Sequence, residues 1–218
     1  MEELVKKLEE EGVLKSPLIK EAFLKVDRKN FLPEELKDRA YEDSALPIGE
    51  GQTISQPFTV AFMLELLEPR RGDKIMDVGS GSGWTSALLS HIVNVESPTF
   101  DIATVGGSEG GGKIFAFEIK NELCEFGEKN VETSYPELAL RISFICGDAK
   151  DGLPGEAPFD GILSSAEVLE VPKAWRHQLV VGGNLIYPKG GSLFKEIKLG
   201  ENKFELKEYP GFVFVPFI

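Results

Sequence analysis

The segment from Lys74 to Trp84 constrains the fold of this chain more than any other. It reads KIMDVGSGSGW: an apolar run with an acid near its end, three glycines alternating with serines, and then a helical pattern from Thr85. Glycines at this spacing allow a tight turn and let the backbone approach a ligand closely. The free N–H groups at the start of the following helix would face a ligand on the loop. The segment therefore predicts a strand, a ligand-binding loop and a helix.

The spacing of the glycines narrows the kind of ligand. Gly79, Gly81 and Gly83 form G-x-G-x-G, which is neither the G-x-G-x-x-G of dinucleotide folds nor a phosphate loop with its lysine. Asp77 precedes the first glycine, where its carboxylate would repel a diphosphate. A cationic or zwitterionic cofactor suits this acid better, and S-adenosyl-L-methionine is the common one. A glycine-rich turn without any ligand is the alternative that the loop alone leaves open.

The bulk properties of the chain fit one domain. Its 218 residues are 42% hydrophobic, which supports one sizeable core but leaves too few residues for two domains of normal size. We therefore expect a single domain over residues 1–218. No run of about 18 apolar residues occurs, so we expect no membrane span. The acidic, amphipathic start of the chain is unlike a signal peptide, which favours the cytoplasm.

Charge and cysteine content argue against further classes of protein. The net charge of −12, from 36 acidic and 24 basic residues, disfavours nucleic acid as a partner. The two histidines and two cysteines show no metal-ligand spacing, so we expect no metal site. We also expect no disulfide. Cys146 is interpreted as a small core residue of a strand, and Cys124 as a helix residue with no group placed to activate it.

Apolar runs and helical periodicity alternate through the middle of the chain. The predicted strands are 74–79, 113–119, 141–146, 159–164 and 183–188, with helices over 85–93 and 121–130. The strand segments are continuous apolar runs, as expected for a parallel sheet buried on both faces. Segments 193–199, 203–209 and 212–217 follow with no helix between them and predict an antiparallel finish. We therefore predict an α/β fold with a doubly wound, mostly parallel sheet and helices on both faces.

Two regions differ from this alternation. Residues 2–40 show helical spacing and 41–56 are interpreted as a loop, so 1–56 form a helical N-terminal extension that ends in a loop. Residues 94–112 are rich in glycine and lie between a predicted helix and a strand, which indicates a flexible surface insertion. Simple decoration, a lid and a contact for a partner all remain open for this insertion.

Acidic residues also follow the next two strands of the predicted sheet. Glu118 closes the strand after the glycine loop, and Gly147-Asp148-Ala149 ends the strand after that. Because parallel strands end at the same edge, Asp77, Glu118 and Asp148 are expected to meet there. Taken alone, Glu118 is also consistent with a solvated strand-end carboxylate, and Asp148 with common turn chemistry. The ordered set of three favours a cofactor site.

Two members of this set have a predicted contact with a particular group of the cofactor. Glu118 would bind the ribose hydroxyls of the cofactor, and Asp148 would accept a hydrogen bond from an exocyclic amine such as the adenine N6. Ser80 in the glycine loop, Trp84 after it and Ile119 beside Glu118 complete the predicted cofactor contacts.

Several longer runs are more specific than the glycine loop. The most specific is LPIGEGQTISQP over residues 46–57, with VDRKNFLP over 26–33 and YED over 41–43. Shorter runs are PFD over 158–160, VP over 171–172, GGNL over 182–185 and FVPF over 214–217. Through these runs nearly the whole chain resembles the protein-L-isoaspartate O-methyltransferases.

The resemblance implies a seven-stranded sheet that binds S-adenosyl-L-methionine and releases S-adenosyl-L-homocysteine. It implies methyl transfer to the carboxylate of L-isoaspartyl residues in damaged proteins, a repair reaction. Separately, we expect the chain to be a monomer. Ser55 would orient the acceptor carboxylate, with Thr53, Ile54 and Gln56 shaping the same wall. A carboxylate and a sulfonium need orientation rather than a general base. The bland alternative for Ser55 is a helix N-cap before Pro57.

The chain departs from the family after the predicted strand at 159–164. The family carries a small apolar segment like Thr-Ala-Ala-Ala-Pro there, whereas residues 164–170 read SSAEVLE. Ser165, Ala166 and Glu167 fall at the predicted substrate wall. If Glu167 faces the acceptor, its charge would cost on the order of 1–4 kcal/mol at a few ångströms. Three hypotheses remain: an isoaspartyl methyltransferase, a relative with another acceptor, and a cofactor-binding protein without methyl transfer.

Overall fold

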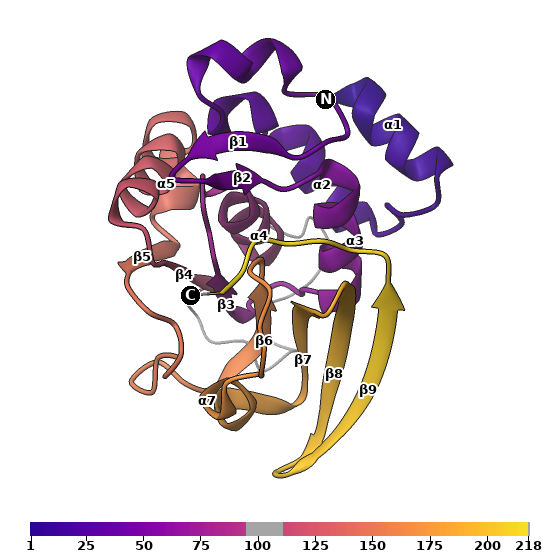
Figure 1. The fold of residues 1–218 in the computed structure, drawn as a ribbon, viewed down its shortest axis with the longest axis vertical. Coiled ribbons are helices and arrows are strands. Elements are labelled where there is room, and N and C mark those ends of the chain that lie inside the picture. The colour runs from indigo at the N-terminus through magenta and orange to yellow at the C-terminus, as the bar shows by residue number, and fades with distance from the viewer. Residues whose placement is uncertain (95–110, 218) are drawn as a thin grey trace.

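One sheet organises the molecule (Figure 1), and it contains seven strands. The structure is a computed structural model and describes residues 1–94 and 111–217. The spatial order of the strands is β5-β4-β3-β6-β7-β8-β9. Their bounds are β3 (Lys74–Val78), β4 (Lys113–Glu118), β5 (Ile142–Cys146), β6 (Phe159–Ser164), β7 (Leu179–Lys189), β8 (Ser192–Gly200) and β9 (Lys203–Pro210).

The direction of the strands confirms the predicted mixed sheet. Strands β3 to β7 pair in parallel with their neighbours, whereas β8 runs antiparallel to β7 and β9 antiparallel to β8. The chain moves outward from β3 through β4 to β5 and then returns to β6 on the other side of β3. Ligands of doubly wound sheets bind at such a reversal, beyond the carboxyl ends of the strands.

The end of the chain leaves the sheet, so the predicted strand at 212–217 is wrong as a member of the antiparallel finish. After β9, Gly211 turns the backbone at a φ of 98°, a conformation that favours glycine. Pro216 has no N–H to give to a ladder and makes only an isolated parallel bridge with Glu167. The C-terminal segment, residues 211–217, is thereby free to pass over the carboxyl edge of the sheet.

Helices fill most of the N-terminal third, as predicted, and then alternate with the strands. They are α1 (Glu2–Glu10), α2 (Pro17–Lys25), the 3-10 turns η1 (Arg28–Phe31) and η2 (Glu34–Arg39), α3 (Pro57–Leu67), α4 (Trp84–Asn94), α5 (Asn121–Ser134), α6 (Pro136–Ala139) and α7 (Lys173–Gln178). The predicted loop at 41–56 is partly wrong, because it holds a hairpin of β1 (Leu46–Gly49) and β2 (Gln52–Ile54). Gly49, Glu50 and Gly51 all have positive φ at its turn, which is typical of tight hairpins.

Both faces of the central parallel strands β3, β4 and β6 are buried, which explains why these strands lack an alternating pattern. On β3, Ile75 packs into one apolar cluster and its neighbour Met76 into a second. The first cluster contains buried residues from α1 through α5, and the second contains Trp175 of α7. Helices therefore cover both faces, with most of them on one side.

One expectation about the cysteines is wrong. Cys124 in α5 and Cys146 at the end of β5 form a disulfide, with their Cα atoms 5.6 Å apart. Their separation of 22 residues carries no sign of pairing. The contact arises because α5 crosses back from the end of β4 to the start of β5 and lies beside that strand.

Three further expectations concern the insertion, a metal site and a membrane span. Most of the predicted insertion at 94–112 lies outside the described residues, since 95–110 are not part of them. Among residues 1–94 and 111–217, no group of His, Cys, Asp and Glu side chains is placed to hold a metal ion. None of the helices in these ranges has the length and apolar character needed to cross a bilayer.

Candidate active site

A cavity of about 1190 Å³ lies at the carboxyl edge of the parallel strands. Its floor is formed by the residues that follow β3, β4, β5 and β6. Residues 52–56 and α3 form one wall, and residues 208–217 form another. The volume exceeds the upper end of about 300–1,000 Å³ for ordinary ligand pockets, so it has room for a cofactor and part of a second molecule.

Most of the residues predicted from the sequence line this single cavity. On the cofactor side these are Gly79, Ser80, Gly81, Trp84, Glu118, Ile119, Gly147 and Ala149. On the substrate side they are Thr53, Ile54, Ser55, Gln56, Ser165 and Ala166. Asp77, Gly83, Asp148 and Glu167 are near the cavity in the chain but do not line it.

The glycine loop is held in place by backbone contacts. Gly79, Gly81 and Gly83 all have positive φ, a region that side chains avoid. A Cβ on Gly83 would lie 2.8 Å from the carbonyl oxygen of Gly127 in α5. Position 83 therefore needs glycine, and its close approach to Gly127 fixes the loop against α5.

Glu118 organises the loop from the end of β4. Its carboxylate accepts hydrogen bonds from the N–H of Gly81 at 2.9 Å and of Lys120 at 3.0 Å. Each carboxylate oxygen can accept a further bond. Glu118 is thus positioned to bind a ligand's hydroxyl groups while it holds the loop, because it also lines the cavity.

Asp77 lies beneath the loop rather than in the cavity wall. It is fully buried, and its Oδ2 accepts a hydrogen bond of 2.6 Å from the Ser86 hydroxyl. Burial raises the pKa of Asp77 to about 7, and the nearby Glu118 carboxylate adds to the rise. The structure therefore places Asp77 as a support of the loop and of α4.

The cofactor side has unused hydrogen-bonding capacity. Beneath the loop, the buried Oδ1 of Asp77 has no partner among the described residues. The buried Oγ of Ser80, a residue that lines the cavity, has none either. Buried polar atoms are usually satisfied, so such atoms beside a cavity indicate a polar ligand. Among the described residues, the charged side chains that line the cavity are those of Glu11, Asp43, Glu118, Glu208 and one cation, Lys120. This excess of carboxylates favours a positively charged ligand, as the sequence predicts.

The remaining cofactor positions differ in their surroundings. Trp84 is buried, and its indole N–H donates to the carbonyl of Val26. Its ring also packs edge-on against Phe23 at 5.4 Å, so it forms part of the cavity wall. Asp148 is exposed and accepts a bond from the N–H of Lys150, while its two neighbours line the cavity.

Ser55 faces the cavity with a free hydroxyl. Among residues 1–94 and 111–217, its Oγ has no hydrogen-bond partner, although its carbonyl accepts from Arg28 at 3.1 Å. The alternative role as a helix cap is wrong, because Gln56 occupies the N-cap position of α3. The Oδ1 of Asp43 accepts from the Phe58 N–H in the first turn instead.

Glu167 turns away from the cavity. Its Oε1 accepts a hydrogen bond of 2.6 Å from the N–H of Gly190, in the turn between β7 and β8. Its backbone N–H donates to Val215, and its carbonyl accepts from Phe217. Glu167 therefore anchors the C-terminal segment. Of residues 164–170, only Ser165 and Ala166 line the cavity.

The sequence did not reveal an aromatic cluster that joins the two walls of the cavity. Phe62 of α3 packs against Tyr209 at 5.4 Å and against Phe212 at 5.1 Å between ring centres. Phe58 stacks on Phe62 at 6.3 Å. All four line the cavity. The only signal was the number of aromatics in two segments that are far apart in the chain.

Comparison with known proteins places these features in one family. The sequence profile described as protein-L-isoaspartate(D-aspartate) O-methyltransferase matches residues 1–218. A protein named protein-L-isoaspartate O-methyltransferase from Methanopyrus kandleri is 37% identical to this chain, and the match covers 100% of this chain and 90% of the relative. A protein of the same name from Thermococcus onnurineus is 38% identical, and the match covers 98% of this chain and 91% of the relative.

A solved structure agrees in fold. A Plasmodium falciparum protein described as a protein-L-isoaspartate O-methyltransferase was crystallised with S-adenosyl-L-homocysteine. It superposes on this chain with a TM-score of 0.84 at 21% sequence identity. The superposition covers 99% of this chain and 97% of that one. The chain belongs to the protein-L-isoaspartate(D-aspartate) O-methyltransferase family.

Proposed function

We propose that this chain transfers a methyl group from S-adenosyl-L-methionine to the carboxylate of L-isoaspartyl residues in proteins. The relatives carry the name of this activity, and the Plasmodium falciparum protein was crystallised with the product of the cofactor. The observation that carries the proposal is that one cavity is lined by both the glycine loop and Ser55. Donor and acceptor can therefore meet without a change of fold.

The glycine loop and the strand ends would hold the cofactor. Ser80 offers a hydroxyl without a partner, and Glu118 offers a carboxylate at the end of β4. Gly147 and Ala149 leave the backbone after β5 open to the cavity. When bound, S-adenosyl-L-methionine supplies a methyl group on a positively charged sulfur, which leaves as a neutral thioether.

Ser55 would hold the acceptor. Its hydroxyl donates a hydrogen bond to one carboxylate oxygen, which leaves a lone pair of the other oxygen to form the new ester bond. No proton needs to move, so the protein contributes proximity, orientation and exclusion of water. Thr53, Ile54 and Gln56 line the same wall. The orientation of Glu167 toward Gly190 removes the charge repulsion that the sequence raised as an objection.

The proposal includes the setting in which the protein acts. Its partners would be proteins and peptides with isoaspartyl residues, methylated by a monomer in the cytoplasm. The net charge of −12 opposes binding to nucleic acid. Gel filtration with light scattering tests the monomer.

The activity is tested with a matched pair of peptides. Methyl-labelled S-adenosyl-L-methionine is incubated with the chain and an isoaspartyl peptide, or with its aspartyl twin. We expect base-labile label on the isoaspartyl peptide alone, because a carboxyl methyl ester is base-labile. We expect Ser55→Ala to lower kcat about 10- to 100-fold while cofactor affinity stays unchanged. Cofactor binding with no label on either peptide would contradict the proposal and favour another acceptor.

A further inference from the structure

Arg28 is a fully buried cation outside the cavity lining. It belongs to η1 and has no solvent exposure. Among the described residues it makes no salt bridge within 4.0 Å. Burial lowers the pKa of Arg28 to about 10, so it remains charged at neutral pH. A buried charge is costly unless its hydrogen bonds are made, so its partners indicate its role.

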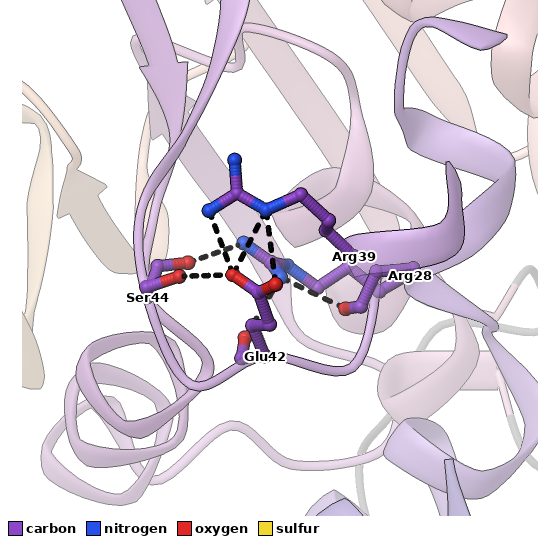
Figure 2. A network of polar contacts seen from close by, with 5 residues as sticks. Arg28, Arg39, Glu42 and Ser44 are labelled. Carbon is purple, nitrogen blue, oxygen red and sulfur yellow. Dashed lines mark hydrogen bonds and ion pairs between the residues drawn. The ribbon is translucent and has the colours of Figure 1, made fainter. Parts of the chain in front are cut away.

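The partners of the guanidinium are backbone carbonyls. Nη1 donates to Ala40 at 2.8 Å and to Glu42 at 3.1 Å. Nη2 donates to Ser44 at 2.8 Å and to Ser55 at 3.1 Å. Figure 2 shows the hydrogen bonds that join Arg28 to Glu42 and Ser44, and the ion pair of Arg39 with the Glu42 carboxylate.

The last two carbonyls define the base of the β1–β2 hairpin. Ser44 precedes β1, which begins at Leu46, and Ser55 follows β2, which ends at Ile54. One nitrogen of Arg28 therefore ties together the two ends of the hairpin. The Ser55 residue whose carbonyl it holds is the same residue whose hydroxyl faces the cavity.

The other side of the guanidinium contacts the cofactor side. Its Cζ lies 5.4 Å from the ring centre of Trp84, in a cation–π arrangement. Trp84 is the first residue of α4, directly after Gly83 of the glycine loop. Arg28 therefore contacts Ser55 on the acceptor side of the cavity and Trp84 on the cofactor side.

We propose that Arg28 is a positioning residue that sets the Ser55 hydroxyl relative to the glycine loop. The expected effect of Arg28 on kcat rests on the proposed function. Its expected effect on the structure of residues 44–56 rests only on the contacts described above. Arginine suits this role because its planar fork carries several donors in fixed directions, whereas lysine is a flexible point charge. A lysine at this position keeps the charge but has a single nitrogen, whereas Arg28 uses two nitrogens to reach the four carbonyls.

The test compares Arg28→Lys with Arg39→Lys. Both make the same substitution in neighbouring turns, but Arg39 is exposed and pairs with the Glu42 carboxylate. Two readouts are needed: kcat for the isoaspartyl peptide beside the cofactor dissociation constant, and hydrogen exchange of residues 44–56. The second readout does not require activity.

We expect Arg28→Lys to lower kcat about 10- to 100-fold, since a misplacement of about 1 Å costs up to about 100-fold. Cofactor affinity should remain within about threefold, a change worth less than 1 kcal/mol. Exchange should accelerate over 44–56 and stay slow in β3 and β6. Arg39→Lys should behave like the wild type in every readout.

Unchanged kcat and unchanged exchange over 44–56 in Arg28→Lys would overturn the proposal. If that variant does not fold, Arg28→Gln replaces it, because it leaves no unpaired charge in the core. Loss of the fold in both would also overturn the proposal, since Arg28 would then support the core in general. A wild type that labels no isoaspartyl peptide would refute the proposed function, while the exchange result would still decide the role of Arg28.

Discussion

At the scale of single residues, the two acids Glu118 and Asp77 have different roles. Glu118 lines the cavity and holds the glycine loop, whereas Asp77 is buried beneath it against Ser86. The difference follows from position: Asp77 is inside β3, where its side chain must enter the core, and Glu118 ends β4 at the open edge. Asp77 therefore affects stability and its pH dependence.

The raised pKa of Asp77 predicts a loss of stability as the pH rises. The unfolded chain loses this proton near the ordinary value of 3.8, but the native state keeps it up to about pH 7. Between these values the native state binds more protons, so the free energy of unfolding falls with rising pH. Asp73, with a pKa raised to about 6 by burial, acts in the same direction.

Thermal unfolding of wild type and Asp77→Asn from pH 4 to 8 checks this prediction. The amide does not titrate, so the variant should lose less stability than the wild type across the window. Parallel stability curves for the two proteins would show that Asp77 is not the group responsible.

Glu167 leads to a prediction about the acceptor. Because its carboxylate accepts from Gly190 and does not line the cavity, Glu167→Gln should leave kcat/KM for an isoaspartyl peptide within about twofold of the wild type. The amide oxygen can still accept the same bond. A tenfold rise in kcat/KM would mean that the charge does act on the acceptor, and steady-state kinetics would detect it.

At the scale of elements, the glycine loop depends on α5 as much as on its own sequence. A Cβ on Gly127 would lie 2.6 Å from the carbonyl oxygen of Gly81. Glycine inside a helix ordinarily costs about 1 kcal/mol relative to alanine. Its presence in the middle of α5 is explained by this contact.

Gly127→Ala should therefore weaken cofactor binding. The helix gains intrinsic stability, but the loop must move to admit the methyl group, and such overpacking costs about 1–3 kcal/mol. Calorimetric titration with S-adenosyl-L-homocysteine should show reduced affinity. Glu128→Ala, at the next and exposed position of α5, is the matched control and should bind normally. Equal affinity in both variants would refute the importance of the close approach.

The disulfide joins α5 to β5 next to the cavity, since Gly147 of the cavity lining directly follows Cys146. Closing a loop of this size stabilises a protein by roughly 3 kcal/mol. Reduction should lower the free energy of unfolding of the wild type, but not of Cys146→Ser, in denaturant titrations. Two titratable thiols in the native, unreduced protein would contradict the bond.

At the scale of the whole molecule, the sequence predicted what depends on local pattern. Strand β3, the glycine loop and α4 follow from apolar runs and glycine spacing. Of the three acids expected to meet at the cavity, Glu118 alone lines it. The disulfide, the aromatic cluster around Phe62 and the contacts of Arg28 could not be predicted. Each joins residues that are distant in the chain, so no local periodicity records it.

The central claim is that donor and acceptor meet in one cavity at Ser55. The most direct measurement is a crystal structure of the chain with S-adenosyl-L-homocysteine and an isoaspartyl peptide. We predict that the cofactor product lies on Gly79 to Gly81 and that the peptide carboxylate accepts a hydrogen bond from the Ser55 hydroxyl. A peptide bound outside the cavity, or a carboxylate held away from Ser55, would contradict the account.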